Sequence, residues 1–244
     1  MKILSSLLSI SLFSSLAFLL LPHPRPATAT ATATPVHQNT SHSHTAADAA
    51  AFARVMCQIK AKSSNSSTAA GANADYVVSS CKTTQSTANL CTSLLIPFAE
   101  DVSGNPATLA CVAMALSAST VRAIKANITQ IRKKADAKTD AALNDCSTTF
   151  NSAEGAIKKS AKMTILLLSQ ATKGKKLNST ISNVRTLMSA ALTDENTCME
   201  GFGEVAPKTD KRRATLKKIV GNAVGQTQIA LAIFELYARK LLST

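Results

Sequence analysis

The sequence predicts an all-α fold, an up-down-up-down four-helix bundle that follows a small helical hairpin and is stabilised by disulfides. The 244 residues include only 8 Gly, no Trp and 4% aromatic residues, whereas a β-sandwich needs more aromatic and β-branched residues and more turn glycines. Four long segments repeat apolar residues every three or four positions, as amphipathic helices do. Because the connections between them are short, sequential helices must be antiparallel.

The first 29 residues have the features of a secretory signal peptide. Lys2 gives a short positive start, residues 3–21 form an apolar run, and residues 27–29 are small enough for cleavage. An uncleaved signal anchor is the alternative, because the apolar run approaches membrane-spanning length. Both interpretations place the remaining chain outside the cytosol. We therefore expect a secreted, extracellular protein with no stable membrane insertion after cleavage.

Residues 30–71 are expected to form a linker, because they are of low complexity. They contain an Ala-Thr repeat and a Ser-rich run. His42 and His44 lie here, in a pattern more typical of a soluble tail than of a metal site. The folded domain is then expected over residues 72–244.

The hairpin is expected over residues 75–95, before the helix-breaking Pro97. The bundle helices are expected over residues 106–135, 139–170, 179–204 and 210–242. The apolar periodicity predicts these inward-facing positions: Leu109, Ala113, Leu116, Thr120, Ile124 and Ile131; Leu143, Cys146, Phe150, Ala153, Ile157, Ala161, Thr164 and Leu168; Val184, Met188, Ala191, Leu192, Met199 and Phe202; Leu216, Ile219, Ala223, Ala230, Ile233 and Tyr237.

The third of these helices has an unusual outer face. Surface helices usually carry Lys, Glu and Arg there, but this face is small and almost uncharged. Short side chains allow another protein to approach closely, and the alternative is simply an exposed helix rich in Ala, Ser and Thr. The candidate partner-binding residues are Ser182, Thr186, Ser189, Ala190 and Thr193.

Six cysteines in a secreted chain indicate disulfides. Cys81 and Cys91 are close enough to staple the hairpin, in a loop worth about 3 kcal/mol. Cys146 and Cys198 lie at helix ends that meet in an antiparallel pair, which allows a second bridge worth about 4 kcal/mol. The last two, Cys57 in the linker and Cys111 opposite its helix's apolar face, pair with each other, stay free or pair between molecules.

The sequence holds no recognisable catalytic machinery, and we expect neither an enzyme nor a cofactor. All four His lie at or before His44, so no Ser-His-Asp or Cys-His mechanism is available in the folded domain. Asp194 and Glu195 are adjacent on a helix and diverge, which suits no acid/base pair. No metal is expected, because the chain has no CxxC motif or Cys/His ligand spacing.

The formal net charge of +13 predicts acidic partners or surroundings. Nucleic acid is not expected, because the basic residues do not alternate with aromatic ones and the chain is expected to be secreted. The main basic cluster is residues 208–218, at the start of the last helix. It indicates either a solvated helix end or a surface for an acidic polysaccharide.

Four sequons make the protein a candidate glycoprotein. Asn178 is the best placed of them, whereas Asn127 lies at the flank of an apolar face, which disfavours its modification. An unmodified surface Asn is the alternative at each position. The candidate glycosylation sites are Asn39, Asn65, Asn127 and Asn178.

The cysteine pattern and its flanking residues resemble the plant invertase/pectin methylesterase inhibitor family. The matching runs are SSCKTTQSTANLC at 79–91, LNDC at 143–146 and NVRTLMSAALTDENTCMEGF at 183–202. The last run resembles the pectin methylesterase inhibitor branch, in which Thr-Trp-Leu-Ser-Ala-Ala-Leu-Thr precedes the final cysteine and Gly-Phe follows it. The resemblance covers residues 75–242.

The resemblance implies a four-helix bundle with an N-terminal hairpin and the disulfides Cys81–Cys91 and Cys146–Cys198. It also implies a non-enzymatic inhibitor that binds pectin methylesterase one to one in the cell wall (the apoplast) and covers the substrate cleft. The motif's Thr matches Thr186.

Three alternatives remain beside this expectation. One is an inhibitor of cell-wall or vacuolar acid invertase, although the Pro-Lys-Phe segment associated with invertase inhibition is not found. Another is a bundle that has lost inhibition and binds acidic pectin through its basic residues. The pro-region of a larger esterase is not expected, because no catalytic domain follows the last helix before Thr244. Leu187 in place of the motif's Trp, and Phe150 where Tyr is common, leave the choice of target open.

Overall fold

The computed structural model describes residues 46–59, 67–169 and 174–243, all of which belong to one compact unit. Helices make up nearly all of these ranges, and the described residues form no strand. The expected signal peptide, residues 1–29, lies outside the described residues, as does the first part of the expected linker.

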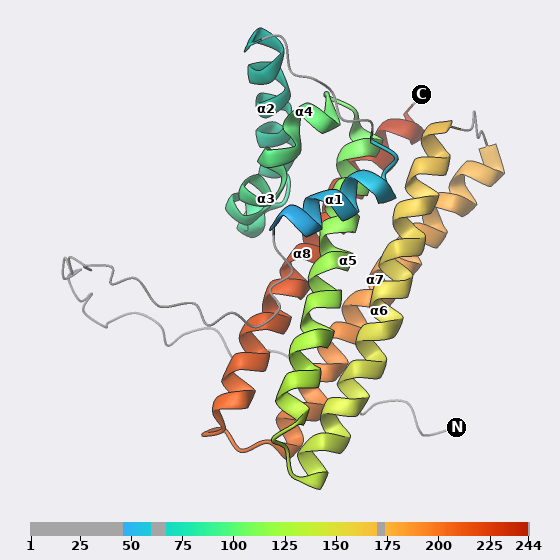
Figure 1. The fold of residues 1–244 in the computed structure, drawn as a ribbon. Coiled ribbons are helices and arrows are strands. Elements are labelled where there is room, and N and C mark those ends of the chain that lie inside the picture. Colours follow the sequence, from blue (N-terminus) through green and yellow to red (C-terminus); the bar gives the residue numbers. More distant parts are fainter. Residues whose placement is uncertain (1–45, 60–66, 170–173, 244) are drawn as a thin grey trace, which may run out of the picture. The chain divides into compact units, whose positions relative to one another are not determined.

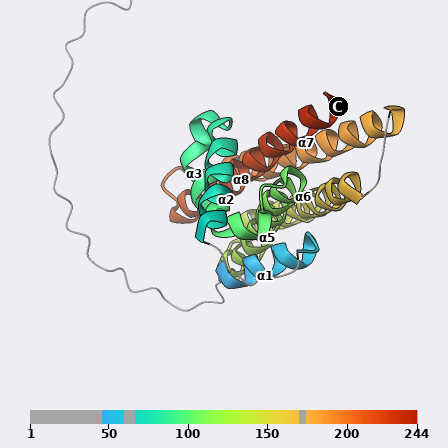
Figure 2. The ribbon, with the colours of Figure 1, turned by 90° about the horizontal axis from the view of Figure 1, so that it is seen from above.

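Four long helices form the bundle, and they run alternately up and down (Figure 1). Each packs against two others in the order α5, α6, α7, α8 and back to α5, as the view from above also shows (Figure 2). The predicted all-α four-helix bundle is confirmed. Its helices are α5 (Pro106–Arg132), α6 (Ala137–Ser169), α7 (Gly174–Val205) and α8 (Lys211–Leu242).

Side-chain caps set the beginnings of three bundle helices. The Asn105 side chain accepts hydrogen bonds from two backbone N–H groups of α5, and Pro106 follows at the first helical position. Asp136 accepts from the Thr139 N–H at the start of α6. Asp210 accepts from the Arg212 N–H at the start of α8. These caps satisfy backbone N–H donors that the first turn of a helix leaves unpaired. Each bundle helix that has such a cap therefore begins directly after a short polar residue.

The centre of the bundle consists of the inward-facing residues that the periodicity predicts. Phe150, Phe202 and Phe234 are among the largest fully buried side chains. Most of the predicted positions are buried, and the side chain of Leu168 is not among those described. The predicted positions that are only half-buried are Thr120, Ile131, Leu192, Met199 and Ile219.

The predicted hairpin precedes the bundle. Its helices α2 (Ser67–Lys82) and α3 (Ala88–Leu95) are joined by the Cys81–Cys91 disulfide. Two short 3-10 turns and the single turn of α4 complete it, at η1 (Gln85–Thr87), η2 (Ile96–Phe98) and α4 (Ala99–Val102). Helix α2 begins before residue 72, so the folded part starts earlier than we expected.

Helix α1 (Ala46–Met56) corrects the expected linker at residues 30–71. It lies along the side of α5 that faces away from the bundle (Figures 1 and 2). The Cys57–Cys111 disulfide holds it there with a Cα–Cα distance of 5.8 Å, which settles the pairing that the sequence left open. The Arg54 guanidinium also donates to the Asp101 carboxylate at 2.9 Å.

The cover that α1 provides explains why α5 is buried on every side over residues 109–118. Among the described residues, α5 and α8 are long and apolar enough to span a membrane, by length and composition alone. In this structure both pack against their neighbours in the bundle.

Candidate functional site

The outer face of α7 is exposed as the sequence predicts. All five candidate residues, from Ser182 to Thr193, are exposed, and they extend for about 16 Å along the helix. The Thr193 hydroxyl donates to the Ser189 carbonyl one turn earlier at 3.2 Å. Thr186 has no side-chain hydrogen bond within the described residues. We call Ser182, Thr186, Ser189, Ala190 and Thr193 the outer stripe.

The outer stripe is held in place from both sides of α7. On one side the Cys146–Cys198 disulfide ties α7 to α6 with a Cα–Cα distance of 4.4 Å, as expected. On the other side the Arg185 guanidinium donates to both carboxylate oxygens of Glu235 in α8, at 2.7 and 2.8 Å. Hydrogen bonding to Glu235 raises the pKa of Arg185. The stripe therefore sits on a backbone that is fixed at both flanks.

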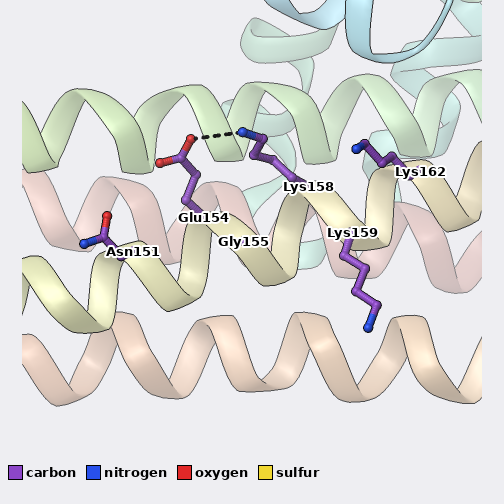
Figure 3. A pocket seen from close by; sticks show the side chains of 6 residues that line it. All are labelled: Asn151, Glu154, Gly155, Lys158, Lys159 and Lys162. Carbon is purple, nitrogen blue, oxygen red and sulfur yellow. Dashed lines mark ion pairs between the residues drawn. The ribbon is translucent and has the colours of Figure 1, made fainter.

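A basic depression of about 430 Å³ lies on α6, the helix beside α7 (Figure 3). Glu154 and Lys158 point towards α5, whereas Lys159 points towards α7. Lys158 pairs with Glu154 at 3.6 Å, and Gly155 leaves the floor of the depression without a side chain. Its lining residues are Asn151, Glu154, Gly155, Lys158, Lys159 and Lys162.

Cations from α5 balance the carboxylate in this depression. Lys125 and Arg122 each donate to Glu154 at 2.9 Å. Burial opposes the ionisation of Glu154, but these hydrogen bonds outweigh it and lower its pKa. Lys159 and Lys162 have no ion pair within the described residues. Of the two, Lys159 points towards α7, so it places a positive charge on the border of α6 next to the outer stripe (Figure 3).

A buried carboxyl group lies on the opposite, inner face of α7. Glu195 is completely buried, and its Oε1 accepts from the Thr227 hydroxyl at 2.7 Å. The Ser117 and Thr227 hydroxyls are also 2.7 Å apart, so this hydrogen-bonded group joins α5, α7 and α8. Glu195 Oε2 has no partner within the described chain. Burial raises the pKa of Glu195 to about 7. The Thr227 hydrogen bond lowers this pKa, and the nearby charge of Asp194 raises it by a smaller amount.

The sequence did not lead us to predict a buried Glu195, although its position in α7 indicates burial. Glu195 follows Ala191 by four residues and precedes Cys198 by three, so it shares the apolar face of α7. The burial of Glu195 keeps it from any substrate, and Asp194 beside it is partly exposed. These two acids therefore do not converge on one reacting group. Among the described residues no three His, Cys, Asp or Glu side chains are placed to hold a metal ion.

The remaining candidates are the four sequons and the basic cluster. Asn127 is exposed in the last two turns of α5, and Asn178 is exposed near the start of α7. Asn39 and Asn65 lie outside the described residues, and all four stay predicted glycosylation sites. The basic cluster at residues 208–218 spans the turn before α8 and the first turns of that helix.

Comparison with known proteins places the chain in a family. The family described as plant invertase/pectin methylesterase inhibitor matches residues 75–233. Pectinesterase inhibitor 9 of Arabidopsis thaliana is 31% identical over 169 residues, which are 68% of this chain and 81% of that protein. The 21 kDa protein of Daucus carota is 30% identical over 157 residues, which are 61% of this chain and 80% of that protein.

Pectinesterase inhibitor 10 of Arabidopsis thaliana is 27% identical over 180 residues, which are 68% of this chain and 52% of that protein. No solved structure matches the chain. The family match covers more than half of the sequence and includes the hairpin, both predicted disulfides and most of the bundle. The chain therefore belongs to the plant invertase/pectin methylesterase inhibitor family.

Proposed function

We propose that the protein is a secreted, non-enzymatic inhibitor of pectin methylesterase in the cell wall. It binds the enzyme non-covalently through the outer stripe of α7 and covers the substrate cleft. The observation that carries the proposal is an exposed stripe of short, uncharged side chains on a helix fixed at both flanks. Family membership and the names of two relatives, pectinesterase inhibitors 9 and 10, support the choice of target.

The shape of the outer stripe suits close contact with another protein. Ser, Thr and Ala project little beyond the helix backbone, so a partner can approach α7 without displacing long flexible side chains. Side chains that are immobilised on binding each cost about 0.5–1.5 kcal/mol, and short residues largely avoid that cost. A stripe that is rigid before binding therefore loses little entropy in the complex.

Charged groups border the outer stripe and form a polar rim. Lys159 of α6 points towards α7, and the Arg185–Glu235 pair lies on the α8 side. Stable protein interfaces commonly have such a rim around a core with few charges. We assign the contact to the outer stripe, centred on Thr186, with these charged groups at its edge.

Acid invertase is the second candidate target, because the family description includes invertase inhibitors. The experiment that separates the two is a titration of purified pectin methylesterase and of purified acid invertase with the folded protein, at acidic and at neutral pH. We expect esterase activity to fall in proportion to added protein up to one equivalent, while invertase activity stays unchanged.

Reduced and alkylated protein is the control, because it lacks the Cys146–Cys198 disulfide that ties α7 to α6. Inhibition of invertase alone would replace the proposal by its alternative. If neither enzyme lost activity, inhibition would be excluded, and a bundle that binds acidic pectin would remain.

A further inference from the structure

Two connections that are far apart in the sequence meet at one end of the bundle. The turn between α5 and α6 and the turn between α7 and α8 both lie at this end (Figure 1). The Arg212 guanidinium donates to the Lys134 carbonyl at 3.3 Å, which joins the two turns directly. Residues 129–140 and 203–215 therefore form one continuous surface.

The arginines and carboxylates of this surface largely satisfy one another. Arg132 donates to both oxygens of Asp140, at 2.8 and 3.1 Å. Arg212 pairs with Asp210 at 2.7 Å, and Arg213 donates to the Ala206 carbonyl at 2.8 Å. These contacts brace the two turns. The Arg212–Asp210 pair also offsets one charge of the basic cluster that the sequence placed at residues 208–218, whereas Arg213 keeps its charge beside a neutral carbonyl.

The lysines of the same surface are not neutralised by these contacts. They are exposed, and none has an ion pair or a side-chain hydrogen bond within the described residues. The two ranges contain eight Lys and Arg against four Asp and Glu, so the surface keeps a clear excess of positive charge. We call the following five residues the lysine end: Lys133, Lys134, Lys138, Lys208 and Lys211.

We infer that the lysine end binds a linear acidic polysaccharide that carries a carboxylate on each repeating sugar. Five ammonium groups from two turns present several compact charges to a polymer whose own charges are closely spaced. The inference concerns a surface other than the outer stripe and does not depend on enzyme inhibition.

The lysine end lacks the side chains with which proteins bind single-stranded nucleic acids or insert into membranes. Neither range contains an aromatic residue, so a single-stranded nucleic acid finds no side chain on which to stack its bases. The large exposed apolar residues of the described chain are Val55, Leu166 and Leu242. Val55 lies on α1, whereas Leu166 and Leu242 lie near the C-terminal ends of α6 and α8, away from the lysine end at their N-terminal ends. An anionic membrane therefore meets no apolar side chain to insert at this end.

The test measures the affinity of the folded protein for polygalacturonate by titration calorimetry at fixed ionic strength. We expect binding that weakens with added salt. One variant neutralises four residues of the lysine end: Lys133→Gln, Lys134→Gln, Lys208→Gln and Lys211→Gln. We expect its affinity to be about tenfold lower or more, because each exposed ion pair contributes modestly and four are removed together.

The matched control removes the same charge from exposed lysines elsewhere, with Lys159→Gln, Lys162→Gln, Lys175→Gln and Lys176→Gln. We expect it to keep an affinity close to that of the unaltered protein. Equal losses in both variants would show a response to net charge alone and would overturn the site. Failure of the unaltered protein to bind polygalacturonate would overturn the inference outright.

Two further ligands separate the classes of polyanion. A single-stranded oligonucleotide and vesicles that contain anionic phospholipid are titrated in the same buffer. If either bound as tightly as polygalacturonate and lost the same affinity in the lysine-end variant, the assignment to a polysaccharide would be wrong. Esterase inhibition by that variant is measured in parallel, and unchanged inhibition keeps this inference distinct from the proposed function.

Discussion

Helix α7 buries Met188 and Glu195 on one face and exposes Thr186 and Ser189 on the other, within about three turns. The inner face contacts α6 and α8 through packing, a disulfide and a buried hydrogen bond. Within the described residues, the side-chain hydrogen bond of the outer stripe stays on its own helix. Substitutions on the inner face should therefore change the stability of the bundle, whereas those on the outer face should change only what the bundle binds.

The largest expected effect comes from the disulfide that anchors the inner face. Cys146→Ser combined with Cys198→Ser opens a loop of 52 residues in sequence separation. The chain-entropy argument gives a loss of about 4 kcal/mol in the free energy of unfolding. Urea denaturation followed by circular dichroism measures it, with the unaltered protein as reference. A loss below about 1 kcal/mol would mean that packing alone holds α7.

A neighbouring pair of residues tests the contrast between the faces within one turn. Met188 is completely buried and Ser189 is exposed. Met188→Ala should lower the free energy of unfolding by about 3 kcal/mol, because it leaves a cavity in the core. Ser189→Ala should change it by less than about 0.5 kcal/mol. The same denaturation experiment compares them, and similar losses for both would contradict the assignment of the faces.

Glu195 makes the inner face sensitive to pH. Its pKa is raised from 4.5 to about 7 by burial, so the folded state favours the neutral acid. The stability that it contributes is fully present below pH 4.5 and is lost as the pH rises through about 7. This corresponds to a loss of about 2–3 kcal/mol in the free energy of unfolding between pH 5 and 8.

The control for this pH effect is Glu195→Gln, which keeps the shape of the side chain and cannot ionise. Other carboxyls act in the opposite direction, since hydrogen bonds lower the pKa of Glu154 and of Asp140. Their contributions are lost at low pH, below the window in which Glu195 titrates. Denaturation curves at several pH values should therefore differ between the two proteins mainly above pH 5. Parallel pH profiles would show that Glu195 does not titrate inside the core.

The sequence was sufficient for the bundle because its apolar periodicity is long and regular. Core positions such as Phe150 and Phe202 follow directly from that periodicity. Helix α1 was missed because its order depends on contacts that are distant in sequence. Ala53 is buried against the bundle, and Cys57 bonds to Cys111 across 54 residues, so low local complexity concealed a packed element.

The candidate site was predictable in part. The exposure of the outer stripe follows from the same periodicity that buries Val184 and Met188, and all five residues are exposed as expected. The lysine end was not predictable as a whole, because it depends on which turns meet in space. A single sequence does not show that Lys134 lies beside Arg212, or that Arg212 is already paired with Asp210.

Inhibition of pectin methylesterase by Thr186→Tyr tests directly whether the outer stripe binds the enzyme. The added ring fills space above the outer stripe without touching the inner face, so the inhibition constant should rise about tenfold or more. Thr215→Tyr is the matched control, because Thr215 is an exposed threonine on α8 about 30 Å away along the bundle axis.

Both variants should unfold at the same urea concentration as the unaltered protein. The proposal predicts weakened inhibition for Thr186→Tyr and unchanged inhibition for Thr215→Tyr. An unchanged inhibition constant for Thr186→Tyr would show that the outer stripe is not the surface that binds the enzyme.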